Sequence, residues 1–267
     1  MLSLRACLSF LLALFCIPVP CPAQKSSISK AEAKFLKTYQ RLRLLENSMD
    51  QGDDYYEQIE KASAEFARAI KLNPASLRYP FRRLIDSHVC RIKTSEDGRF
   101  RIYSWDILGG GSARYFNSII QWKDRAARQQ HTQYNYSKSE FDIVAPYVEE
   151  IHTVDVGQNR YYLTIWGHVI SSSGYNQSIQ AYTIRNSKLI DSDKLFKTLK
   201  DSLNNIYVDF SANNQVRITH VSKLAIRYDQ KRKAVLIPLI TEEEITNRYL
   251  VYRLRNGSFR YTGTEAY

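Results

Sequence analysis

Residues 142–170, DIVAPYVEEIHTVDVGQNRYYLTIWGHVI, decide the fold class of this 267-residue chain. Two runs rich in Val, Ile, Tyr and Trp, at 142–156 and 161–170, flank the turn signal GQN at 157–159. β-branched and aromatic residues favour strands, and Gly and Asn favour tight hairpin turns. The stretch therefore predicts a long antiparallel hairpin.

The same pattern extends on both sides of this hairpin, from residue 88 to the end of the chain. Short runs of strand-forming residues alternate with turn clusters. Closely spaced strands without crossover helices predict antiparallel sheets, arranged as a sandwich or barrel. One short helix is expected to interrupt them, at 193–203. The other expected strands are 88–93, 100–107, 114–122, 178–185, 206–210, 215–220, 224–228, 234–240, 249–254 and 258–261.

Residues 29–72 carry a helical period instead. Ser29 and Glu32 have the spacing of a capping box, which predicts that the first helix begins there. Apolar side chains then recur every three or four residues, and Asn73-Pro74 ends a second helix. The apolar positions are Phe35, Tyr39, Leu42 and Leu45 in the first helix and Ile59, Ala62, Phe66, Ala69 and Ile70 in the second. The sequence thus predicts an α+β protein whose N-terminal helical hairpin packs on a C-terminal antiparallel β domain.

The first 23 residues have the pattern of a signal peptide. Arg5 supplies a positive charge, residues 8–17 form an apolar segment, and Ala23 precedes a cleavage site before Gln24. Such a segment is too short to cross a bilayer, which takes about 20 residues. We therefore expect export to the periplasm or beyond, with no transmembrane segment in the mature chain. The helical region would span 24–86 and the β domain 87–267.

Cleavage at this site would remove Cys7, Cys16 and Cys21 and leave Cys90. The mature chain would then form no internal disulfide, although export would permit one. Cys90 lies in a run expected to be a strand, which predicts a buried and inert thiol.

The formal net charge is +11, from 38 basic and 27 acidic side chains. The basic residues are spread along the chain, and 231–233 is the only basic triplet. Proteins that bind nucleic acids usually gather such charge on one face, so we expect no nucleic-acid partner. A diffuse positive surface suits solubility and also fits anionic envelope glycans or lipids.

Residues 95–106, SEDGRFRIYSWD, are followed by a glycine-rich turn and Gln121-Trp122. Together they resemble uncharacterised exported β-rich proteins of Bacteroidetes-type bacteria, and 226–229 and 248–252 resemble closing strands of the same group. The resemblance implies a periplasmic or secreted β protein and implies no activity. The Trp-Asp ending of this stretch also resembles one blade of a propeller, so a propeller is an alternative to the sandwich or barrel.

The sequence contains no metal or cofactor motif, and we expect neither ligand. The histidines are scattered, and there is no paired cysteine, nucleophile elbow or phosphate-binding loop. The histidine positions are His88, His131, His152, His168 and His220.

Four carboxylates lie in or at the ends of expected strands, where a cleft could collect them. Glycosidases need two acids a few Å apart, so Asp106, Glu149, Glu150 and Asp155 are the candidates for catalysis. The alternation of side chains along a strand predicts opposite faces for Glu149 and Glu150. A glycan-directed hydrolase that uses such a pair is the alternative function.

Aromatic residues make up 12% of the chain, with 19 Tyr, and many stand beside polar groups. Flat rings next to hydrogen-bond donors bind sugars, so Tyr103, Trp105, Trp122 and Trp166 are the candidate binding residues. Large sheets also gather aromatic residues without a ligand, and Trp105 is expected to pack in the core. The sequence favours a non-catalytic binding or structural module of the cell envelope, with a glycan or a protein as partner. Assembly through the helical face from Phe35 to Phe66 is a third alternative.

Overall fold

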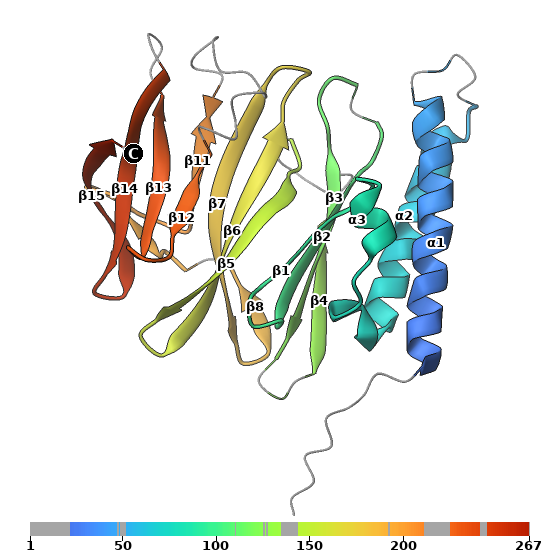
Figure 1. The fold of residues 1–267 in the computed structure, drawn as a ribbon, viewed down its shortest axis with the longest axis horizontal. Helices are drawn as coiled ribbons and strands as arrows, with labels where there is room; N and C mark the ends of the chain where they lie inside the picture. Colours follow the sequence, from blue (N-terminus) through green and yellow to red (C-terminus); the bar gives the residue numbers. More distant parts are fainter. Residues whose placement is uncertain are drawn as a thin grey trace, which may run out of the picture.

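The computed structural model describes residues 22–46, 48, 52–109, 111–124, 126, 128–134, 144–191, 193–210, 225–240 and 245–266. Figure 1 shows four layers that follow one another in chain order, a layer of helices and then three β-sheets. This arrangement confirms an α+β protein with a β-rich C-terminal part. Residues 1–21 of the predicted signal peptide and the expected strand at 215–220 lie outside the described residues.

The helical layer consists of two long antiparallel helices followed by two short ones. Both predicted long helices are present, and none of the described helices is long and apolar enough to span a membrane. Asn73 ends the second helix and accepts a hydrogen bond from the Ala75 N–H at 3.0 Å, which starts the next turn. The elements are α1 (Pro22–Leu45), α2 (Tyr55–Leu72), the 3₁₀ helix η1 (Pro74–Leu77) and α3 (Arg82–Asp86).

The expected capping box at Ser29 is wrong, because α1 begins at Pro22 and Ser29 lies inside the helix. Glu32 does not reach back to the start of its own helix. Its buried carboxylate accepts hydrogen bonds from Tyr79 Oη at 2.7 Å and from the Arg83 N–H at 3.1 Å. Glu32 therefore joins α1 to the segment that leads from η1 into α3.

The first sheet is a four-stranded antiparallel meander. Its strands follow the order of the chain, and consecutive strands are neighbours throughout. Strand β4 is rich in Gln and was not expected from the sequence. The strands are β1 (Arg91–Thr94), β2 (Phe100–Asp106), β3 (Phe116–Lys123) and β4 (Gln129–Tyr134).

The middle sheet contains the predicted hairpin, formed by β5 and β6. It has the order β11-β7-β6-β5, with β8 paired to β7 as an extension. Its strands are β5 (Tyr147–Val156), β6 (Asn159–Val169), β7 (Tyr175–Arg185), β8 (Lys188–Ile190) and β11 (Asn205–Asp209).

The last sheet has the order β10-β9-β15-β14-β13-β12 and is antiparallel except where β15 pairs with β9. The helix expected at 193–203 is wrong, because this segment forms β9 and β10. Phe196 lies in the core between the last two sheets and pairs with Phe259, so tertiary packing determines its conformation. The strands are β9 (Phe196–Lys197), β10 (Ser202–Leu203), β12 (Arg227–Asp229), β13 (Ala234–Ile240), β14 (Ile245–Arg255) and β15 (Ser258–Ala266).

Three hydrophobic cores separate the four layers. Strand β2 supplies two of them, because its side chains alternate between the two faces of the first sheet. Tyr103 and Trp105 point to the helices, while Phe100 and Ile102 point to the middle sheet. The helices thus cover the face of the first sheet on which a propeller would place another blade.

Candidate functional site

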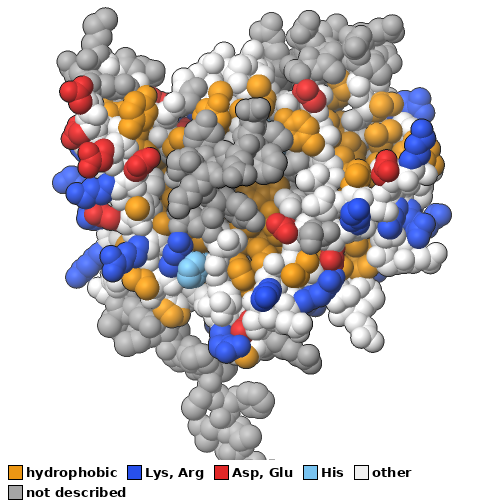
Figure 2. Space-filling model, turned by 180° about the vertical axis from the view of Figure 1, so that it is seen from behind, with side chains coloured by type: hydrophobic (Ala, Val, Ile, Leu, Met, Phe, Trp, Pro, Cys, Tyr) orange, Lys and Arg blue, Asp and Glu red, His pale blue; other side chains and the backbone are white. Residues whose placement is uncertain are grey.

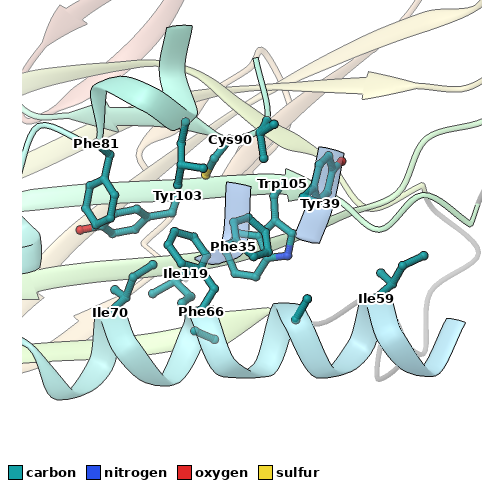
Figure 3. Packing of buried hydrophobic residues seen from close by; sticks show 14 of the residues in the cluster. Phe35, Tyr39, Ile59, Phe66, Ile70, Phe81, Cys90, Tyr103, Trp105 and Ile119 are labelled. Atoms are coloured by element: carbon teal, nitrogen blue, oxygen red, sulfur yellow. The ribbon is translucent and has the colours of Figure 1, made fainter. Parts of the chain in front are cut away.

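Two of the four predicted binding aromatics form the core between the helices and the first sheet. Trp105 is fully buried against Phe35 and Phe66 (Figure 3). Its indole N–H donates to Ser63 Oγ at 3.0 Å. Tyr103 is also fully buried and donates to Gln121 Oε1 at 2.8 Å. The expectation that Trp105 packs in the core is confirmed. Neither ring has a face open to a sugar.

The other two aromatics lie between the first and middle sheets. Trp122 and Trp166 are 6% and 5% exposed and belong to one core cluster. The Trp122 indole N–H donates to the carbonyl of Ser187 at 3.3 Å, whereas Trp166 Nε1 has no partner in the described part of the chain. These rings join sheets and do not form a platform for a ligand, which corrects their assignment as a binding surface.

Asp106 lies at the end of β2, close to the residue that follows α1. It lies 3.5 Å from Arg114 Nη1, and the same guanidinium contacts Glu46 at the end of α1. Burial raises the pKa of Asp106, and the Leu108 N–H and the charge of Arg114 oppose that rise. Asp106 therefore shares a cation with a helix and holds the helical layer against the first sheet.

Glu149 lies at the centre of a polar cluster on the middle sheet. Its carboxylate accepts from Tyr147 Oη at 3.1 Å, from Gln177 Nε2 at 2.5 Å and from the hydroxyl of Tyr175. Gly167 leaves room for this cluster, because a Cβ there would lie 2.6 Å from the Tyr175 oxygen. Both oxygens of the Glu149 carboxylate thus have partners on β7, which they reach across β6.

Glu150 shares the face of Glu149, which corrects the prediction of opposite faces. The register of β5 on β6 shifts between Val148 and Glu150, so a β-bulge interrupts the alternation. Glu150 is exposed and pairs with His152 at 2.8 Å. Sequence spacing alone carries no signal for such a bulge.

Asp155 is exposed near the tip of the β5–β6 hairpin and pairs with Arg160 at 2.9 Å. Each of the four candidate carboxylates therefore has its own partners, and no contact joins Asp106 or Asp155 to the two glutamates.

No cluster of three or more metal-ligating side chains occurs among the described residues. Cys90 is buried, as predicted, and burial raises the pKa of its thiol far above the usual range.

The described surface contains a groove between α1 and α2, with a cavity volume of about 550 Å³. Phe35 and Phe66 stack at its base, with ring centroids 4.3 Å apart. Alanines line its walls, and their side chains are too short to cover the two rings. The lining residues are Ser27, Ala31, Lys34, Phe35, Thr38, Ala62, Glu65, Phe66, Arg68, Ala69, Leu72 and Asn73.

Helical spacing explains how the sequence builds this groove. Ala31, Phe35 and Thr38 fall on one stripe of α1, and Ala62 and Ala69 fall two turns apart on α2. The helical period predicted Phe35, Ala62, Phe66 and Ala69 as part of the buried face of a helical hairpin. It did not distinguish the part of that face that covers the sheet from the part that stays open, because both have the same period.

The rim of the groove carries charge and one large apolar side chain. Lys34 and Glu65 form an ion pair across it at 2.6 Å, and the hydrogen bond from Lys34 lowers the pKa of Glu65. Arg68 is exposed and has no ion-pair partner in the described part of the chain. Leu72 is 70% exposed at one end. The groove is apolar at its base, with one unpaired positive charge on its rim.

The wider surface shows no single patch of basic charge on the face drawn in Figure 2. Lys and Arg side chains lie on both flanks of that face, and hydrophobic side chains lie between them.

Comparison with known proteins adds no functional assignment, since no family model, curated protein or solved structure matches the chain.

Proposed function

We propose that this chain is an exported, non-catalytic binding module of the cell envelope that holds an amphipathic helix of a partner protein. The groove between α1 and α2 carries the proposal. A third helix laid along it would place apolar side chains on Phe35 and Phe66 and complete a three-helix layer. The three sheets, as a sandwich-like stack, would serve as the rigid support of the helices.

The unpaired charge on the rim sets the chemistry of the partner. An acidic side chain beside the apolar stripe of the partner helix would meet Arg68, which has no competing carboxylate of its own in the described structure. The exposed Leu72 extends the apolar contact at one end of the groove. We therefore propose a partner helix with Leu or Phe at helical spacing and Glu or Asp along its flank.

Binding of designed helical peptides tests this proposal. We expect an 18-residue peptide with a Leu stripe and Glu flanks to bind the full chain in a fluorescence anisotropy titration. The same peptide with Lys flanks should bind at least tenfold more weakly. Arg68→Glu should reverse this preference, because it replaces the positive charge on the rim with a negative one.

Two matched alanine substitutions separate the groove from the rest of α2. Ala69 lines the groove, whereas Ala64 is exposed on the same helix outside it. Ala69→Trp should fill the groove and weaken peptide binding at least tenfold, while Ala64→Trp should leave it unchanged. Equal binding by both variants, or no preference between Glu and Lys flanks, would overturn the proposal.

Export is the second part of the proposal, and it has its own test. Expression with the native N-terminus in a bacterium with a periplasm should release a mature protein that begins at Gln24, as measured by intact mass. Retention of residues 1–23 in the cell-envelope fraction would contradict it.

A further inference from the structure

A second group of charged side chains lies at the end of the β2–β3 ladder, away from the groove. The backbone N–H of Lys123 donates to the carbonyl of Arg99 at 2.9 Å, so the two residues face each other across neighbouring strands. The guanidinium of Arg99 donates to the carbonyls of Lys123 at 3.3 Å and of Asp124 at 2.9 Å. Two positive side chains thus occupy directly opposed positions, an arrangement that destabilises a sheet by itself.

Two more arginines adjoin this pair. Arg101 follows on β2 and is 5% exposed. Its Nη1 donates to the carbonyls of Ser76, Leu77 and Tyr79 at 2.9, 3.0 and 2.8 Å, while its Nε has no partner in the described part of the chain. These bonds fix the C-terminal end of η1. They thereby fix the backbone of Arg78, the residue that follows η1 and whose charge acts on Lys123.

No carboxylate of the described residues forms an ion pair with Arg78, Arg99 or Lys123. The two nearby acids have other partners, since Asp124 pairs with Arg128 at 3.0 Å and Asp97 with Arg160 at 3.2 Å. Burial lowers the pKa of Lys123, and the charges of Arg78 and Arg99 lower it further. Such a group of cations is stabilised when an anion adds a countercharge.

We propose that Arg78, Arg99 and Lys123 form a binding site for an oxyanion of the phosphate or sulfate class. Three half-buried or exposed cations with many N–H donors match the several acceptor oxygens of such a group. Arg101 acts as a positioning residue, because it holds η1 in place from the buried side. The site lies on η1 and the first sheet, so it is independent of the proposed peptide groove.

Isothermal titration calorimetry of the full chain with inorganic phosphate tests the site, at pH 7.5 and low salt. We expect saturable binding that Lys123→Gln and Arg99→Gln each weaken at least tenfold. Lys123→Arg should retain binding, since the charge remains. Lys200→Gln is the control, because Lys200 is exposed between β9 and β10 in the last sheet and should not affect binding.

Thermal unfolding supplies a second readout that a merely structural role would not produce. Without phosphate, Lys123→Gln should melt at or above the wild-type temperature, because it removes like-charge repulsion. With phosphate, the wild type, Lys123→Arg and Lys200→Gln should gain stability beyond that given by sodium chloride of equal ionic strength, whereas Lys123→Gln and Arg99→Gln should not. Equal gains in all variants, or no binding of phosphate, would overturn the proposal.

The source of the oxyanion is distinguished by parallel titrations with glycerol phosphate and with a sulfated disaccharide. If these bind at least tenfold more tightly than inorganic phosphate, the site recognises a group attached to a larger ligand. If inorganic phosphate binds as well as either, the free ion is the ligand. The variants of Lys123 and Arg99 must weaken whichever compound binds.

Discussion

At the scale of single residues, Gly167 shows why one position on a buried strand accepts no side chain. It lies on β6 directly opposite Tyr147 on β5 and Gln177 on β7. A Cβ at this position would lie 2.6 Å from Tyr175 Oη, 2.7 Å from Tyr147 Cζ and 2.9 Å from Glu149 Oε1. Any side chain here must therefore displace a carboxylate and two hydroxyl groups that hold one another in place.

We expect Gly167→Ala to lower the free energy of unfolding by about 2 kcal/mol, because overpacking a filled interior costs about 1–3 kcal/mol. Urea denaturation followed by circular dichroism measures the loss. Gly109→Ala is the matched control, since its Cβ would lie 3.2 Å from the ring of the exposed Tyr56 and 3.8 Å from the Ile107 carbonyl oxygen, which is an ordinary contact. A loss in the control equal to that in Gly167→Ala would show that the cluster imposes no steric limit.

Cys90 provides a second prediction at this scale. Burial raises the pKa of its thiol, so the reactive thiolate is scarce in the folded chain. In a protein cleaved before Gln24, a thiol reagent at pH 8 should modify Cys90 only as fast as the chain unfolds, and at once in urea. Ser112→Cys adds a thiol at an exposed position and should react rapidly under the same conditions. Rapid modification of native Cys90 would contradict its burial.

At the scale of secondary-structure elements, Trp105 and Ser63 connect β2 to α2. The indole N–H of Trp105 donates to Ser63 Oγ at 3.0 Å inside the core between the helices and the first sheet. A buried donor that loses its only acceptor costs about 1–3 kcal/mol. The contact between α2 and β2 thus combines this hydrogen bond with aromatic packing.

A double-mutant cycle tests this connection. Ser63→Ala should lower the free energy of unfolding by about 1–3 kcal/mol in the wild type, because it leaves the indole N–H unpaired. In the background of Trp105→Phe there is no donor to leave unpaired, so the same substitution should cost clearly less. Equal losses in both backgrounds would mean that the hydrogen bond does not couple α2 to the sheet.

The elements differ in how far the sequence predicts them, for physical reasons. Strand β13 has the predicted bounds, because its residues are almost all apolar strand formers. Strand β4, QQHTQY, gives no hydrophobic signal, since pairing with β3 rather than burial defines it. The segment at 193–203 has apolar residues at helical spacing, yet its pairing with β15 makes it extended. Local patterns thus fail where a distant strand determines the conformation.

The candidate sites show the same division. The helical stripes predicted four apolar residues of the groove, Phe35, Ala62, Phe66 and Ala69, but not that one side would stay open. The group formed by Arg78, Arg99 and Lys123 was not predicted. Its members are far apart in the sequence and meet only because of the register of β2 on β3 and the position of η1. The aromatic residues chosen from the sequence are in the core, since a strand buried on both faces has no solvent side.

At the scale of the whole molecule, buried tyrosines make the free energy of unfolding fall at alkaline pH. Burial raises the pKa of Tyr147 to about 12, and raises the pKa of Tyr103, Tyr162 and Tyr175 further. In the unfolded chain a tyrosine loses its proton near pH 10. Above that pH the unfolded chain binds fewer protons than the folded one, so the free energy of unfolding falls as pH rises.

We therefore expect the tyrosines to change the urea midpoint little between pH 7.5 and 9. The midpoint should then fall steeply between about pH 10 and 12, where tyrosines of the unfolded chain lose their protons. Absorbance at 295 nm should show that the buried tyrosines ionise only when the chain unfolds. Tyr56→Phe is the control, because Tyr56 is 57% exposed. A midpoint that stays constant up to pH 11 would contradict the prediction.

The stacking of the four layers in chain order also bears on how the chain is made. A polypeptide emerges N-terminus first, and here each layer packs on the one that emerged just before it. The helices and the first sheet can therefore pack together while the strands of the last sheet are still being synthesised. The main exception is the β9–β10 pair, because the other side of β9 stays without its neighbour until β15 has been made. The last sheet is thus complete only after β15 has been made, since β15 joins β9 to β14.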